Sequence, residues 1–243
     1  LQDIKAVFSN TPFFISPGNH DWYGNNSWFG GKENLHRHLL PFLQKELGSA
    51  MNGQLFYSFR TKNSLFIFTN HAGMEIGLDF EQREWLEKNL AGADANPSIE
   101  HVFVFGHCGL WNVNYVRFNE NAELLPILAE SKKLKAYFAG HVHRNNMTVW
   151  RFPGKNPVFQ VVTAGLFADS MNLPQEEHFL TLNPPLSQRG YMGFPQNAPS
   201  YCRITISAGK VRLRFEKIAG TTLADIEFNT PGEIRENHML KTK

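Results

Sequence analysis

The chain has few cysteines, little net charge and no long apolar run, and each of these shortages excludes a class of protein. Two cysteines in 243 residues, Cys108 and Cys202, exclude a disulfide framework and leave the redox compartment open. No apolar stretch approaches the roughly 20 residues that a helix needs to cross a bilayer. The formal net charge is only +2, so nothing in the composition favours binding to duplex nucleic acid or to an anionic membrane.

What the chain does have is the composition of a globular protein with an aromatic core. Hydrophobic residues make up 42% and charged residues 19%, which is ordinary for such proteins. The 21 phenylalanines favour tightly packed sheets. No change in composition marks a second domain, so we interpret residues 1–219 as one domain and residues 220–243 as a polar tail.

Strands and helices alternate in the first part of the chain, and strands predominate later. Apolar spacing predicts a helix over 33–47, and Asp79 with Gln82 predicts the capped start of another that runs through Leu90. The remaining predicted elements are a hairpin of strands 54–60 and 64–70, a helix over 122–133, and strands 147–152, 158–163, 201–207 and 210–218. Residues 166–200 read as a long loop. This order predicts an α/β fold of two sheets packed face to face, with helices outside.

Three further apolar segments, predicted as strands, each run into a glycine and a histidine. Residues 13–16 lead into Gly18-Asn19-His20-Asp21, residues 101–105 into Gly106-His107, and residues 136–139 into Gly140-His141-Val142-His143. Ligands in open α/β sheets bind outside the carboxyl ends of the strands. These three ends can therefore bring imidazole, amide and carboxylate groups to one place. Such nitrogen and oxygen donors predict a transition-metal site.

Each motif taken alone is weak. A lone H-x-H is more often a pair of solvated loop histidines, and Gly18-Asn19-His20-Asp21 also fits a turn capped by a side chain. Recurrence at three strand ends, in a chain with ten histidines, favours a shared centre. His71 also follows a predicted strand and could face that centre, although an ordinary buried or surface histidine is the more common case.

In order and spacing, the motifs resemble those of the calcineurin-like metallophosphoesterase superfamily. The family pattern is D-x-H, G-D-x-x-D, G-N-H-D/E, a lone histidine and G-H-x-H, and this chain matches the last three. The resemblance covers about residues 11–218 and implies a four-layer αββα sandwich. It also implies that the domain is incomplete at its N-terminus, with the first two motifs upstream of Leu1.

The resemblance further implies a dinuclear centre of divalent or trivalent ions (Mn, Fe or Zn) that activates a bridging hydroxide. By position, Asn19, His107 and His141 match ligands of one metal, and His143 matches a ligand of the other. The bridging aspartate would lie upstream, so we expect residues 1–243 alone to be inactive.

Two further residues of the first motif have implied roles in catalysis. His20 matches a histidine that does not bind metal, which makes it the candidate general acid. Asp21 would hold the orientation of that imidazole, and the alternative for Asp21 is a loop cap.

The function expected from this resemblance is hydrolysis of phosphate monoesters or diesters, with a small molecule or a phosphoprotein as substrate. One alternative is a nuclease or nucleotide hydrolase of the same fold, against which the lack of a basic patch counts. Another is a non-catalytic scaffold, which would be expected to have lost motif residues. Every motif position within the chain is intact, which favours the enzyme.

Overall fold

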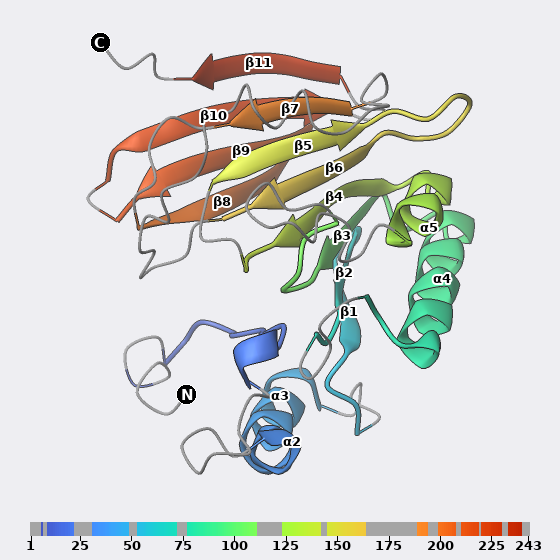
Figure 1. Cartoon of the computed structure of the whole chain (residues 1–243), viewed down its shortest axis with the longest axis vertical. Coiled ribbons are helices and arrows are strands. Elements are labelled where there is room, and N and C mark those ends of the chain that lie inside the picture. Colours follow the sequence, from blue (N-terminus) through green and yellow to red (C-terminus); the bar gives the residue numbers. More distant parts are fainter. Residues whose placement is uncertain are drawn as a thin grey trace.

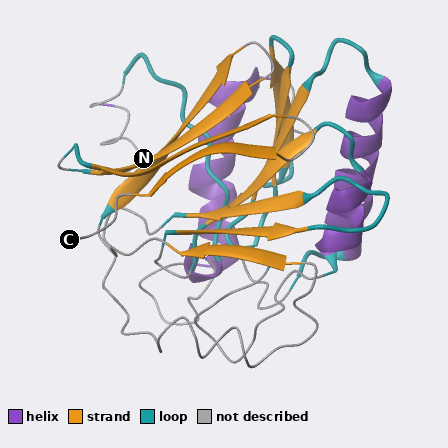
Figure 2. Ribbon diagram, turned by 90° about the horizontal axis from the view of Figure 1, so that it is seen from above, coloured by secondary structure: helices purple, strands orange, loops and turns teal. Residues whose placement is uncertain are grey.

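The computed structural model describes residue 6 and residues 9–21, 31–48, 53–71, 77–110, 123–141, 145–163, 189–193, 199–207, 210–218, 220–229 and 233–239. In this part of the chain two sheets lie face to face, with helices beside the larger one (Figure 1). Figure 2 gives the same arrangement from above, with strands and helices coloured differently. No helix among the described residues is long and apolar enough to span a membrane.

The larger sheet has seven strands among the described residues, and the smaller has four. In spatial order, the larger sheet consists of β1 (Tyr57–Thr61), β2 (Ser64–Phe68), β3 (His101–Phe105), β4 (Leu134–Ala139), β6 (Val158–Val162), β5 (Asn146–Trp150) and β7 (Arg189–Gly193). The smaller consists of β11 (Glu233–Met239), β10 (Thr222–Asn229), β9 (Lys210–Lys217) and β8 (Ser200–Ser207). Neighbours among β2, β3, β4 and β6 are parallel, and all other neighbours are antiparallel.

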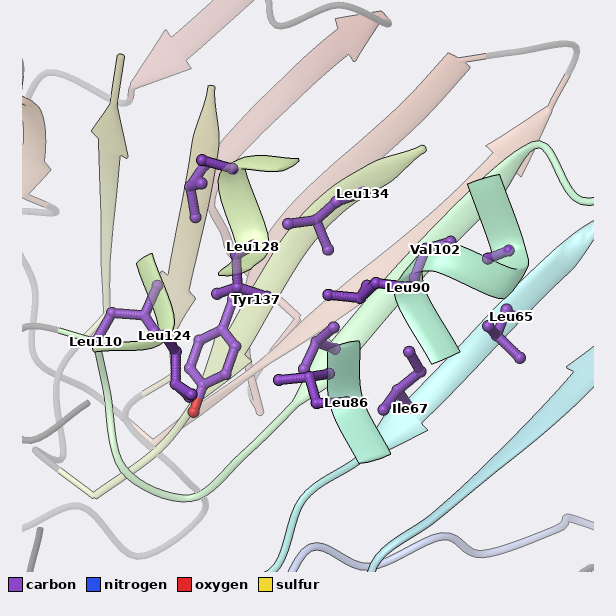
Figure 3. Packing of buried hydrophobic residues seen from close by; sticks show 14 of the residues in the cluster. Leu65, Ile67, Leu86, Leu90, Val102, Leu110, Leu124, Leu128, Leu134 and Tyr137 are labelled. Atoms are coloured by element: carbon purple, nitrogen blue, oxygen red, sulfur yellow. The ribbon is translucent and has the colours of Figure 1, made fainter. Parts of the chain in front are cut away.

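The parallel strands β2, β3, β4 and β6 are buried on both faces, as is usual for such strands. One face packs on α4 (Phe80–Ala95) and α5 (Leu124–Glu130), through a cluster that includes Ile67, Leu86 and Tyr137 (Figure 3). The other face contributes side chains such as Phe103 to a second cluster, which Leu213 and other residues of the smaller sheet complete. The predicted α/β fold of two packed sheets flanked by helices is therefore confirmed.

Local sequence signals place the helices. Asp79 caps α4 as predicted, because its Oδ1 accepts a hydrogen bond from the Gln82 N–H at 2.8 Å. The helix predicted over 122–133 ends earlier, at Glu130. The N–H groups of Lys132 and Lys133 donate to the Asp94 carboxylate instead of continuing the helical ladder.

The helix predicted over 33–47 forms in three pieces. α2 (Gly31–Asn34) passes into a π-helical turn, η2 (Leu35–Leu39), and then into α3 (Leu40–Leu47). Pro41 has no N–H to donate to the preceding turn, which accounts for the break in the α-helical ladder. Leu39 and Leu43 pack against Tyr57 and Phe68, so this helical region covers the β1 side of the larger sheet.

Three predictions are wrong in the described part of the chain. Residues 13–16 form no strand: the Ile15 N–H and C=O bond instead to the Tyr57 hydroxyl, at 2.8 and 3.0 Å. The expected polar tail contains β10 and β11, and β7 lies within the expected loop 166–200. The sequence of β10 looks polar because it contains Asp225 and Glu227. In the structure both pair with basic side chains of β9, whereas Ile226 between them is buried in the core.

Candidate metal centre

The carboxyl ends of β2, β3 and β4 lie at one edge of the larger sheet, because these strands are parallel neighbours. His107 follows β3 by two residues, and His141 follows β4 by two. The Gly106 N–H donates to Phe138 O at 2.9 Å, and the Gly140 N–H donates to His107 O at 3.0 Å. Backbone hydrogen bonds thus hold two of the three motifs side by side.

The first motif reaches the same edge from outside the sheet. Residues Asn19–Asp21 form a short 3-10 turn, η1, and Gly18 before it is buried against the ring of His107. A Cβ atom at residue 18 would lie 2.6 Å from His107 Cγ, closer than any real side chain approaches. Glycine is therefore required for this approach.

The three motifs meet at the ring of His107. Its Nε2 lies 3.0 Å from Asn19 Oδ1 and 3.2 Å from His141 Nδ1. The two imidazole rings are 5.1 Å apart between centroids and inclined at 73°. All three residues are partly exposed.

These separations fit a transition-metal ion. Donors about 2.0–2.1 Å from one ion, at tetrahedral or octahedral angles, lie roughly 3.0–3.4 Å from each other. An amide oxygen and two imidazole nitrogens are also suitable donors. The described residues contain no cluster of three or more histidine, cysteine or acidic side chains, because the third donor here is an amide. His143, the fourth predicted ligand, lies outside the described residues.

The backbone of His141 adopts a left-handed conformation, with φ at +65°. Few non-glycine residues have a positive φ, although histidine is enriched among them. Such conformations persist where the surrounding structure imposes them, and they gather at functional sites. Here the conformation accompanies the sharp turn by which the chain leaves β4 and brings the ring beside His107.

His20 and Asp21 are exposed and lie on the 3-10 turn. The Gly18 N–H donates to Asp21 Oδ2 at 2.8 Å, and the Asp21 N–H donates to Gly18 O at 3.1 Å. Asp21 therefore forms the loop cap that the sequence left open as its alternative role. Its predicted action on the His20 imidazole stays a prediction.

The sequence left His71 open between a residue that faces the centre and an ordinary buried or surface histidine, and in the structure it contacts His107. Its side chain is fully buried, and its Nδ1 accepts a hydrogen bond from the His107 N–H at 3.1 Å. His71 follows β2 just as His107 and His141 follow β3 and β4, so position after a parallel strand was the available signal. No glycine introduces it, which is why the recurring motif did not include it.

Comparisons with known proteins bear on the family and the fold. The calcineurin-like phosphoesterase family profile matches residues 1–145, a range that contains all the motif residues. The chain is similar in fold to a purple acid phosphatase, PPD1, from yellow lupin (Lupinus luteus) seeds, with a TM-score of 0.63 and 18% identity. That match covers 88% of this chain and 40% of the lupin chain.

A second solved structure, of PhoD, matches with a TM-score of 0.50 and 13% identity, over 80% of this chain and 47% of the other. The chain thus spans less than half the length of either protein. The comparison with curated proteins gave no match. Because the family profile covers more than half of the 243 residues, the assignment rests on the sequence as well as the fold. The chain belongs to the calcineurin-like phosphoesterase family.

Proposed function

We propose that this protein hydrolyses phosphate esters at a two-metal centre to which Asn19, His107, His141 and His143 contribute ligands. The observation that carries the proposal is the position of His107 Nε2, within 3.2 Å of donor atoms from both other motifs. Those three motifs are far apart in the sequence, so their convergence is a property of the fold. Membership of a phosphoesterase family supports the reaction class.

The metals would be divalent or trivalent ions of Mn, Fe or Zn, for which imidazole and amide donors are suitable. When bound, such a pair supplies Lewis acidity that lowers the pKa of water and neutralises the oxygens of the phosphoryl group. The named donors are all neutral, so they leave most of the cationic charge available to an anionic substrate.

His20 is the proposed general acid, which donates a proton to the leaving alkoxide. It is next to the proposed ligand Asn19 and its side chain is exposed, so a substrate at the metals could reach it. Asp21 fixes the turn that carries His20, through its two hydrogen bonds with Gly18. We propose that this cap is how Asp21 sets the direction of the His20 imidazole.

Residues 1–243 alone are proposed to be inactive. The four named donors comprise three ligands of one ion and a single ligand of the other, and none of them is a bridging carboxylate. Two-metal hydrolysis needs both ions, one at the attacking oxygen and one at the leaving oxygen. The named donors are too few to hold the second ion.

The test compares residues 1–243 with the complete product of the gene, each supplied with Mn, Fe or Zn ions and then assayed on an aryl phosphate monoester and a diester. We expect hydrolysis by the complete product and little or none by residues 1–243. Metal binding without hydrolysis of either ester by the complete product would reject the enzyme and favour the non-catalytic scaffold. Full activity of residues 1–243 would reject the proposed need for further ligands.

A further inference from the structure

We infer that His71 is a positioning residue of the metal centre, which holds the His107 backbone in the place that metal binding requires. The inference rests on the proposed function and extends it beyond the ligand set. It starts from three hydrogen bonds that run through His71 and His107 and connect all three motif loops.

The first hydrogen bond ties His71 to the loop of Asn19. The His71 N–H donates to Pro17 O at 3.1 Å, one residue before Gly18. The second joins His71 to His107, whose N–H donates to the ring Nδ1 at 3.1 Å. The third joins His107 to the loop of His141, since the Gly140 N–H donates to His107 O at 3.0 Å. The peptide groups on both sides of His107 are therefore held, one of them by the ring of His71.

The ring of His71 is itself fixed by its surroundings. Its side chain is fully buried, and a Cβ atom at Gly106 would lie only 2.6 Å from its Cε1. The Cε1 atom of the ring is thus packed close to Gly106, the residue before His107. A backbone N–H can donate only to an unprotonated ring nitrogen, so this contact selects the neutral tautomer with the proton on Nε2.

Small displacements at this point matter for the metal. Groups outside the ligand set that orient metal ligands typically change metal affinity by about 10–100-fold when they are removed. If His107 moves, its Nε2 leaves its place between Asn19 Oδ1 and His141 Nδ1. The competing role for His71 is to fill space in the core, and the two roles predict different outcomes for different substitutions.

The test uses His71→Asn and His71→Leu in the complete gene product. Both replacements remove the ring and both branch at Cγ, but only asparagine keeps an acceptor, its Oδ1, near the position of Nδ1. The readout is the affinity for Mn²⁺ and Zn²⁺ in competition with a chelator, together with the unfolding midpoint of the metal-free protein. We expect His71→Leu to lose about 10–100-fold in affinity and His71→Asn to recover most of that loss.

Equal affinities in the two variants, whether at the wild-type level or reduced alike, would overturn the inference, because the acceptor would then not matter. If His71→Leu does not fold, ¹⁵N NMR of the wild-type His71 ring decides instead. The neutral tautomer with the proton on Nε2 is expected, and a proton on Nδ1 would overturn the inference. A wild-type protein that binds metal but hydrolyses no ester rejects the proposed function and leaves the comparison of the variants valid.

Discussion

The ring of His107 lies against the backbone of Gly18, so closely that a Cβ atom at residue 18 would fall 2.6 Å from His107 Cγ. Gly18→Ala should therefore displace the His107 ring and lower metal affinity by about 10-fold or more. Titration with Zn²⁺ measures this loss. Gly92→Ala is the matched control, since nothing lies within 4 Å of a Cβ at that helical position. Unchanged affinity in Gly18→Ala would show that the approach of this loop does not set the ligand geometry.

Gly106, the residue before His107, is a second glycine at which neighbouring side chains leave no room for a Cβ atom. A Cβ atom there would lie 2.8 Å from Thr69 Oγ1 and would also contact the Tyr137 hydroxyl, which donates to Cys108 O at 2.7 Å. We expect Gly106→Ala to lower the free energy of unfolding by roughly 1–3 kcal/mol through overpacking. Urea unfolding measures it.

Tyr137→Phe removes the hydroxyl that this new methyl group would meet. Combined with Gly106→Ala, it should therefore destabilise the protein by less than the sum of the two single changes. If the losses in unfolding free energy of the two single variants simply add, the new methyl group does not clash with the Tyr137 hydroxyl.

His20→Ala should reduce kcat by about 10²–10⁴-fold while the bound metal stays at the wild-type level, because His20 is proposed to transfer a proton and not to bind metal. Steady-state kinetics and elemental analysis of the same sample provide the two readouts. His107→Ala is the control that should lose metal. If His20→Ala also lost metal, the assignment of His20 as a non-ligating residue would be wrong.

Lys135 on β4 is buried, with 4% of its surface exposed, and burial lowers the pKa of its ammonium group to about 8. The unfolded chain keeps this proton up to about pH 10.4 and so binds more protons than the native state between about pH 8 and pH 10.4. The contribution of Lys135 to the free energy of unfolding therefore rises with pH across that window, by on the order of 1–3 kcal/mol.

Lys135→Met should accordingly be more stable than the wild type near pH 7 and should show a flatter dependence on pH. Urea unfolding at pH 7, 8.5 and 10 measures both effects, with the exposed Lys88→Met as control. Wild-type and Lys135→Met stabilities that stay parallel across this range would contradict the prediction.

Elements with strong local signals were predictable from the sequence. Asp79 and Gln82 marked the start of α4, and apolar segments ending in glycine marked β3 and β4 with the histidines that follow them. Residues 13–16 also read as a strand, but they form none. Their apolar character is local, whereas a strand needs a partner, and Ile15 bonds to a tyrosine side chain instead.

The sequence by itself determined that His107 and His141 each follow a glycine at the end of an apolar strand, because apolar strand segments and the placement of glycines are local features. Only the tertiary structure decided that His107 Nε2 lies between Asn19 and His141, that the His71 ring accepts a hydrogen bond from the His107 N–H, and that apolar residues of the polar-looking β10 complete the core. These relations join residues 34 to 88 positions apart or depend on which face of a strand is covered. Such contacts arise only when the parallel strands and the second sheet assemble.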